Sequence, residues 1–150
     1  MRALIIEDDE DKLADIAEYL AELFPEVEIA EAKSLQSGKH SALEAGHDVI
    51  LLDMTMRNFD RTAIEDGGRP HSFAGREILR QMRRHRVTTK VIVVTHFDRF
   101  GDENDYVTLD ALKQELSQRF ENYVGTVQYR SNVDDWRPAL AALLEAIVGG

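Results

Sequence analysis

Residues Val49–Asp53 read VILLD, four consecutive aliphatic residues that end at one carboxylate. A second run, Val91–Thr95 (VIVVT), ends at a hydroxyl in the same manner. Unbroken aliphatic runs of this length are typical of strands buried on both faces, which is the condition of central strands in a parallel sheet. We therefore expect two central parallel strands, with Asp53 and Thr95 at their carboxyl ends.

Outward from these runs, short apolar segments alternate with longer segments of helical period. In the first helical segment, Leu13, Ile16, Leu20 and Phe24 recur every three or four residues and Pro25 follows. Strand then helix, five times over, predicts an α/β fold with a doubly wound five-stranded parallel sheet of the flavodoxin-like, (βα)5 type. The strands are expected at 3–6, 27–30, 49–52, 91–94 and 125–129, and the helices over 13–24, 34–45, 74–85, 108–120 and 135–148.

Length and composition narrow the range of possible functions. The chain has 150 residues, 43% of them hydrophobic, no cysteine and a formal net charge of −10. We expect one domain over 1–150 that folds on its own. The acidic balance disfavours nucleic acid and anionic membrane as partners, and the absence of cysteine excludes thiol chemistry. The N-terminal segment fits neither a signal peptide nor a spanning helix, so a cytoplasmic location is expected.

Two connections are longer than such a fold requires. One runs from Arg57 to Ser72 and the other, rich in acids, from His96 to Tyr106. We expect both to be loops, and loops of this length are usually functional or mobile.

Acidic residues gather where the predicted strands end. Glu7, Asp8 and Asp9 follow the first strand, Asp53 follows the third, and the fourth ends in Thr95. Ligands of open parallel sheets bind outside these carboxyl ends. Two like charges 4 Å apart repel by about 4 kcal/mol at an effective dielectric of 20, so the cluster must be neutralised.

The oxygen-only donor set predicts a hard cation, and Mg²⁺ is the one that shares its coordination with phosphate. A carboxylate beside such a cation is a competent phosphoryl acceptor. Asp53 is the candidate nucleophile, and Thr95 is placed to hydrogen-bond the phosphoryl oxygens. Taken alone, Glu7, Asp8 and Asp9 would also suit the positive end of a helix dipole.

Three motifs in order, IIEDD at 5–9, LLDMTM at 51–56 and VIVVT at 91–95, resemble the receiver domain of two-component response regulators over essentially the whole chain. The resemblance implies a CheY-like fold and phosphorylation of Asp53. It further implies that Asp8 binds Mg²⁺ directly, that Glu7 acts through water, and that the backbone carbonyl of Thr55 completes the metal site. Thr95 would be the switch hydroxyl whose reorientation repacks the output face.

The sequence also departs from the receiver pattern. Receivers carry a lysine at the end of the fifth strand, where this chain reads QYRSN at 128–132. Arg130 is the candidate for that positive charge, although a guanidinium does not replace an ammonium neutrally. Counting back from the last helix places Tyr129 at the same position. Arg57 stands where receivers usually have a proline, and His96 stands where they have a small residue.

The leading functional hypothesis is a stand-alone receiver in a phosphorelay. It would accept a phosphoryl group from a histidine kinase or phosphotransfer protein and signal by changed affinity for a downstream protein effector. The alternative, motivated by the missing lysine and by His96, is a pseudo-receiver that binds proteins without phosphorylation. A phosphohydrolase with an aspartate nucleophile ranks last, because Thr55 occupies the place of its usual second acid.

Overall fold

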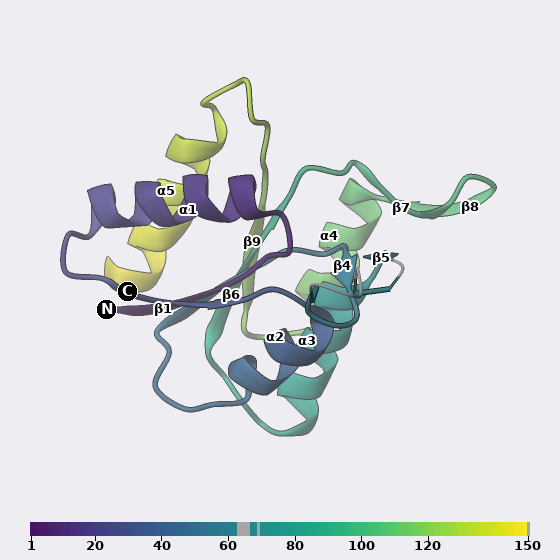
Figure 1. The fold of residues 1–150 in the computed structure, drawn as a ribbon, viewed down its shortest axis with the longest axis horizontal. Helices are drawn as coiled ribbons and strands as arrows, with labels where there is room; N and C mark the ends of the chain where they lie inside the picture. Colours follow the sequence, from purple (N-terminus) through teal and green to yellow (C-terminus); the bar gives the residue numbers. More distant parts are fainter. Residues whose placement is uncertain (63–66, 69, 150) are drawn as a thin grey trace.

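The predicted strands form one parallel sheet in the order β2-β1-β3-β6-β9 in a computed structural model that describes residues 1–62, 67–68 and 70–149 (Figure 1). The predicted fold class is therefore confirmed. The sheet consists of β1 (Arg2–Ile6), β2 (Glu28–Ala32), β3 (Val49–Leu52), β6 (Lys90–Thr95) and β9 (Tyr123–Gln128).

Helices cover the two faces of the sheet, as Figure 1 shows, and the described residues form five of them. They are α1 (Glu10–Leu23), α2 (Leu35–Ala42), α3 (Ala74–Arg84), α4 (Leu109–Arg119) and α5 (Trp136–Gly149). Helices α1 and α5 pack on one face and helices α2, α3 and α4 on the other, so each face has its own cluster of buried side chains. Among the described residues, no helix is long and apolar enough to cross a membrane.

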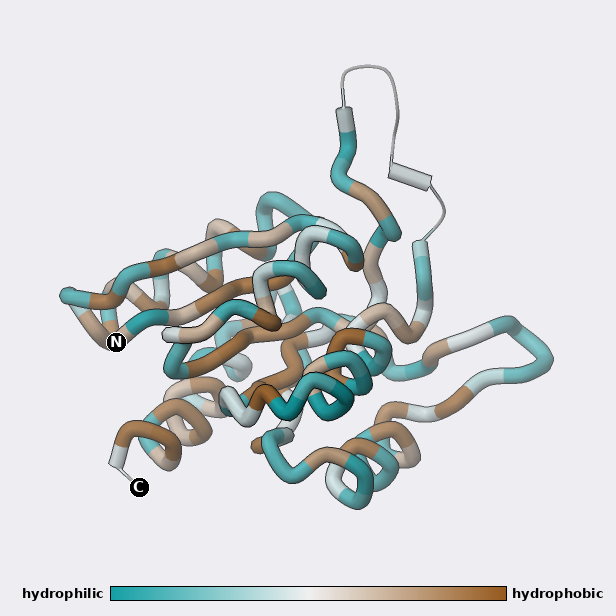
Figure 2. The backbone as a smooth tube through the Cα atoms, turned by 90° about the horizontal axis from the view of Figure 1, so that it is seen from below, coloured by the Kyte–Doolittle hydropathy of each residue, from teal (hydrophilic) through white to brown (hydrophobic). Residues whose placement is uncertain are grey.

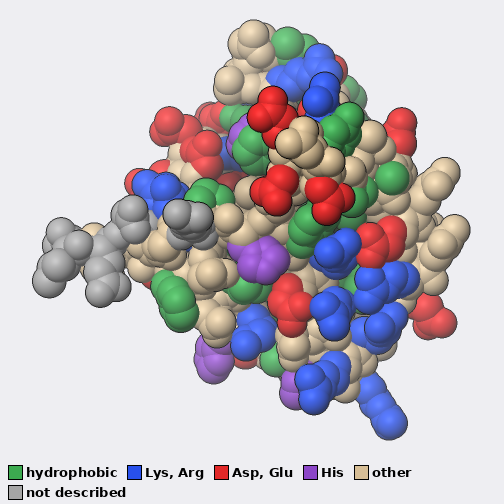
Figure 3. Space-filling model, turned by 90° about the vertical axis from the view of Figure 1, so that its right-hand side faces the viewer, with side chains coloured by type: hydrophobic (Ala, Val, Ile, Leu, Met, Phe, Trp, Pro, Cys, Tyr) green, Lys and Arg blue, Asp and Glu red, His purple; other side chains and the backbone are tan. Residues whose placement is uncertain are grey.

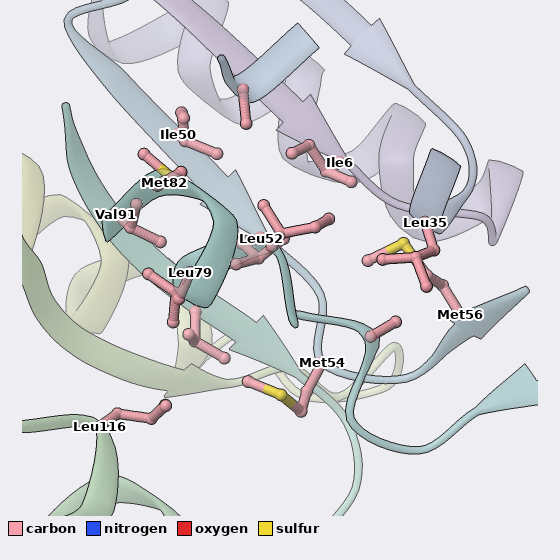
Figure 4. Close-up of a cluster of buried hydrophobic side chains, with 14 of the residues drawn as sticks. Ile6, Leu35, Ile50, Leu52, Met54, Met56, Leu79, Met82, Val91 and Leu116 are labelled. Carbon is pink, nitrogen blue, oxygen red and sulfur yellow. The ribbon is translucent and has the colours of Figure 1, made fainter. Parts of the chain in front are cut away.

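The apolar runs of the sequence lie at the centre of the sheet, where Figure 2 shows segments of hydrophobic residues. All four residues of β3 are buried, and only Lys90 of β6 is exposed. Side chains of β1, β3 and β6 that point toward α2 and α3 meet Met54 and Met56 there, as Figure 4 shows. Because unbroken aliphatic runs fill both faces of these strands, they can only be central.

The register of the sheet fixes where the strands end. Ile6 lies beside Leu52, and Leu52 lies beside Val93. The residues that follow each strand therefore emerge at one edge of the sheet. This edge carries the predicted acids, so the fold itself places the candidate site.

The predicted loop over 96–106 is wrong for most of its length. The chain there forms an antiparallel hairpin of β7 (Arg99–Asp102) and β8 (Asp105–Thr108), which extends away from the sheet in Figure 1. Phe100 anchors the hairpin, because it is buried and packs against Phe73 with ring centroids 6.3 Å apart. One buried aromatic in an otherwise polar segment is a weak strand pattern, which is why the sequence indicated a loop.

The other long connection, Arg57 to Ser72, is also partly ordered. Two short strands, β4 (Met56–Arg57) and β5 (Pro70–His71), pair antiparallel. Residues 63–66 and 69 of this connection lie outside the described residues. The paired part lies beside the edge that carries the predicted acids, because the backbone amide of Arg57 donates a hydrogen bond to Asp8.

Candidate functional site

The structure brings three of the predicted acids together at the edge of the sheet. Carboxylate oxygens of Glu7, Asp8 and Asp53 all lie within 4.8 Å of one another. Glu7 and Asp53 are only 2% and 3% exposed, and Asp8 is half-buried. Asp9 has a different role, because its Oδ1 accepts hydrogen bonds from the backbone amides of Asp11 and Lys12 and so caps α1. Three close carboxylates require cations.

A lysine from α1 supplies one of them. Lys12 is 1% exposed, and its Nζ lies 2.5 Å from Oε1 of Glu7 and 3.2 Å from Oδ1 of Asp53. The same ammonium donates a hydrogen bond to the carbonyl oxygen of Val94 at 2.8 Å. Lys12 therefore joins the first helix to the ends of β1, β3 and β6.

Sequence reasoning missed Lys12, yet a signal was present. Lys12 precedes Ile16 and Leu20 at intervals of four, so it extends the buried stripe of α1 toward the acids. A lysine on a buried stripe is stable only when its charge is paired. A lysine at such a position, four residues after Asp8, therefore indicates an internal ion pair.

Burial and neighbouring charges together shift the pKa values of Glu7 and Lys12. Burial, followed by the negative charge of Asp53, raises the pKa of Glu7 from 4.5 to about 9, although Lys12 opposes the shift. Burial lowers the pKa of Lys12, but the charges of Asp53 and Glu7 outweigh burial and raise it overall. The ammonium is therefore retained as a cation inside the protein.

One oxygen of Asp53 is held by two donors. Oδ1 accepts a hydrogen bond from the backbone amide of Met54 at 2.8 Å and is paired with Lys12. Thr95 is fully buried at the end of β6, where its Oγ1 accepts a hydrogen bond from the amide of Phe97. The carboxylate is thus fixed by its neighbours, with the predicted switch hydroxyl at the end of the adjacent strand.

A cavity of about 820 Å³ opens over these groups. Its lining includes Asp8, Asp53 and Thr55 from the strand ends, together with His96. The side chain of Thr55 donates a hydrogen bond to the carbonyl of Ser72, which attaches the predicted metal-site segment to the connection before α3. The cavity is therefore polar. Its lining includes every residue predicted to hold Mg²⁺ except Glu7, which is buried.

Comparisons with known proteins found relatives that match nearly the whole chain. No protein-family model matches the chain. It is 35% identical to the uncharacterized protein y4jR of Sinorhizobium fredii over 93% of this chain and 94% of that protein. It is 29% identical to the Detocs response regulatory protein DtcB of Enterobacter cloacae over 93% and 95%.

Solved structures share the fold. The receiver domain of the sensor histidine kinase PA1611 from Pseudomonas aeruginosa, which holds a magnesium ion in its active site cleft, matches with a TM-score of 0.63, 18% identity and coverage of 99% of this chain and 98% of that one. The response regulator domain of Thermotoga maritima CheB matches with a TM-score of 0.66, 20% identity and coverage of 99% and 94%. By its fold the chain is a CheY-like receiver domain.

This receiver differs from the pattern described above at the end of its last strand. The backbone amide of Tyr129 donates to the carbonyl of Thr95, which places Tyr129 directly after β9, beside the end of β6. Arg130 is exposed and is not among the described residues that line the cavity. The cation that contacts Asp53 is Lys12. Tyr129 thus occupies the place where a receiver lysine is expected.

Arg57 stands where receivers usually have a proline, and this difference affects Asp8, a predicted metal ligand. Its backbone amide donates a hydrogen bond to Oδ2 of Asp8 at 3.1 Å, and its guanidinium lies 3.6 Å from the same oxygen. A proline has no amide hydrogen and could not make the first contact. Arg57 therefore orients Asp8 and offsets part of its charge.

Proposed function

We propose that this receiver accepts a phosphoryl group on Asp53 and works in a phosphorelay. The observation that carries the proposal is the state of the Asp53 carboxylate, which is buried beneath an open polar cavity and has Oδ1 fixed by Met54 and Lys12. A fixed carboxylate with one oxygen engaged presents the other to an incoming phosphorus atom. Positioning of this kind is the main contribution of a protein to phosphoryl transfer.

The donor chemistry fits Mg²⁺. Glu7, Asp8 and Asp53 offer only carboxylate oxygens within 4.8 Å of one another, and hard oxygen donors are what Mg²⁺ prefers. Asp8, Asp53 and the backbone carbonyl of Thr55 would hold the ion directly, with Glu7 acting through water. When bound, the ion offsets charge on the phosphoryl oxygens.

The proposed step is a displacement at phosphorus. Oδ2 of Asp53 forms a bond to phosphorus while the bond from phosphorus to the donor breaks, and its electron pair leaves with the donor. The donor is phosphohistidine on a histidine kinase or phosphotransfer protein. The product is an aspartyl phosphate, whose added charge would be read at Thr95 and then by a downstream protein effector. The likeness to a response regulatory protein supports such a signalling role.

Intact mass after incubation with acetyl phosphate and Mg²⁺ tests the proposal. We expect one phosphoryl adduct on the wild type and none on Asp53→Asn. Asp60→Asn is the matched control, because Asp60 lines the same cavity but is exposed and accepts a hydrogen bond from Ser37. An unmodified wild type, or an adduct that persists in Asp53→Asn, would overturn the proposal.

One observation favours the phosphorylation-independent alternative. Lys12 and Arg57 already pair with the acids, so two cations partly neutralise the cluster before any metal ion binds. A protein-binding module without phosphorylation would need no more than this. An unmodified wild type that also shows no heat of Mg²⁺ binding in calorimetry would support this alternative.

A further inference from the structure

We infer that Lys12 is the fixed cation of the phosphoryl site, delivered from the first helix in place of a lysine at the end of the last strand. The inference rests on the proposed function. Nζ of Lys12 contacts the reacting carboxylate at 3.2 Å, and two further acceptors, Glu7 and the Val94 carbonyl, hold it there at 2.5 Å and 2.8 Å. Three acceptors define the position of an ammonium that has three donors.

Other cations around the cavity do not reach Asp53. Lys33 lines the cavity, but its side chain is 45% exposed and its Nζ lies 3.4 Å from Glu10. Arg57 faces Asp8, and Arg130 is exposed. Among the described residues, the ion pairs of Asp53 involve Lys12 alone. Lys12 is therefore the cation paired with Asp53, whichever residue of 128–132 corresponds to the receiver lysine.

Tyr129 explains why the charge comes from the helix. Its ring centroid lies 5.8 Å from Nζ of Lys12, and its hydroxyl donates to Oδ2 of Asp15, one turn further along the same helix. The tyrosine fills the space at the end of β9 and closes over the buried ammonium. A neutral phenol at the strand end thus accompanies a charge supplied by α1.

The position of Lys12 predicts its chemical effect. Before transfer, the ammonium and the Met54 amide both hold Oδ1, which leaves Oδ2 as the attacking oxygen. After transfer, Asp53 carries additional negative charge in a buried site, and the ammonium offsets it. Charge-assisted contacts of this kind are strong where water is excluded.

The same charge should repel a metal ion. Lys12 contacts two of the three clustered carboxylates, Asp53, which would hold Mg²⁺ directly, and Glu7, which would act through water. Removal of the ammonium should therefore slow phosphoryl transfer but tighten Mg²⁺ binding. A residue that only maintained the fold would weaken both.

Lys12→Gln is the decisive variant, because the amide keeps a donor for the Val94 carbonyl and loses the charge. We expect phosphoryl incorporation from acetyl phosphate to slow by about 100-fold, the loss typical of removing one preorganised donor. We expect the dissociation constant for Mg²⁺, measured by calorimetry, to fall several-fold. Lys33→Gln is the matched control and should change neither quantity by more than about twofold, because exposed charges are screened.

A rescue experiment completes the test. Tyr129→Lys in the Lys12→Gln background should restore at least about a tenth of the wild-type rate, because it returns an ammonium to the strand end. An unchanged rate in Lys12→Gln while the wild type is phosphorylated would overturn the inference but leave the proposed function standing. An unmodified wild type would overturn the proposed function. If Lys12→Gln in addition bound Mg²⁺ with unchanged affinity, the charge effect assigned to Lys12 would also be overturned.

Discussion

The hydroxyl of Tyr129 donates a hydrogen bond to Oδ2 of Asp15 at 2.5 Å and so ties the residue after β9 to α1. Burial, together with the hydrogen bond and charge of Asp15, raises the pKa of the phenol. The phenol is therefore a neutral donor to a carboxylate at physiological pH.

Tyr129→Phe should lower the free energy of unfolding by about 1.5–3 kcal/mol, the range for a hydrogen bond to a charged group. Urea denaturation measures the change. Tyr106→Phe is the control, because Tyr106 is 45% exposed on the hairpin and should change stability by less than about 0.5 kcal/mol. Equal effects of the two substitutions would contradict the assigned hydrogen bond.

Thr95→Ala should leave Mg²⁺ affinity nearly intact, because the predicted ligands are carboxylates and a backbone carbonyl. It removes the acceptor for the Phe97 amide and the hydroxyl proposed to meet the phosphoryl group. Hydrogen exchange of α4, β9 and α5 should therefore no longer respond to acetyl phosphate. Thr88→Ala, at an exposed site before the opposite end of β6, should respond like the wild type. A full response in Thr95→Ala would refute the switch role.

Gly75→Ala should both destabilise the protein and impair the site. A Cβ at Gly75 would lie 2.5 Å from the carbonyl oxygen of Asp53 and 3.0 Å from Cα of Met54, and backbone atoms cannot move away cheaply. We expect a loss of about 1–3 kcal/mol in thermal or urea unfolding, together with slower phosphoryl uptake. Gly149→Ala has no atom within 4 Å of its Cβ and should be neutral. A stable, active Gly75→Ala protein would contradict this packing.

The ion pairs of Glu115 predict an effect of pH on stability that is independent of the phosphoryl site. Its carboxylate joins α3 to α4, with Oε1 3.0 Å from Arg76 and Oε2 2.5 Å from Arg119. Burial raises the pKa of Glu115, but its hydrogen bonds and the charges of Arg119 and Arg76 outweigh this and lower it below 4.5. Since the folded pKa is the lower one, the stabilisation is present above pH 4.5 and is lost as pH falls through the folded value.

Glu115→Gln should therefore cost less than about 1 kcal/mol near neutral pH, because the side chains are partly exposed. The difference from the wild type should shrink in denaturation curves recorded below pH 4.5. Glu121→Gln, at an exposed residue after α4, is the control and should change stability by less than about 0.5 kcal/mol. A difference that grows on acidification would be inconsistent with the depressed pKa.

Several arginines of α3 are likewise accounted for locally. Arg76 pairs with Glu115, Arg80 with Glu77, and Arg83 donates to the carbonyl of Arg119. Figure 3 shows Lys and Arg side chains gathered on one part of the face that it displays, with acidic side chains between them. This mixture of charges is typical of a solvated helix face.

The sequence predicted the fold because the deciding features are local. The aliphatic run at 49–52 and the stripe of α1 each report burial directly through their period. The acids were predicted to meet because parallel strands end at one edge. The hairpin escaped prediction because its buried anchor, Phe100, lies among polar residues, and its contact with Phe73 exists only in the folded chain.

The cation at Asp53 was not predicted, for a different reason. The receiver pattern places this charge at the end of the last strand, where the sequence offers Arg130, whereas the ammonium belongs to α1, far earlier in the chain. A buried lysine is acceptable only when its partners are assembled, and that assembly is a property of the tertiary structure. The sequence shows Arg57 only as a missing proline, because its amide contact with Asp8 depends on the path of β4.

The arrangement of Lys12 and Tyr129 has a consequence for evolution. Tyr129 stands where receivers carry a lysine, and Lys12 on the neighbouring helix supplies the ammonium instead. The two positions should therefore vary together among relatives. A tyrosine after the last strand together with the spacing D-x-x-x-K from Asp8 to Lys12 would form a readable signature. Chains that keep a terminal-strand lysine should show an apolar residue at the helix position instead, because a second buried ammonium would lack acceptors.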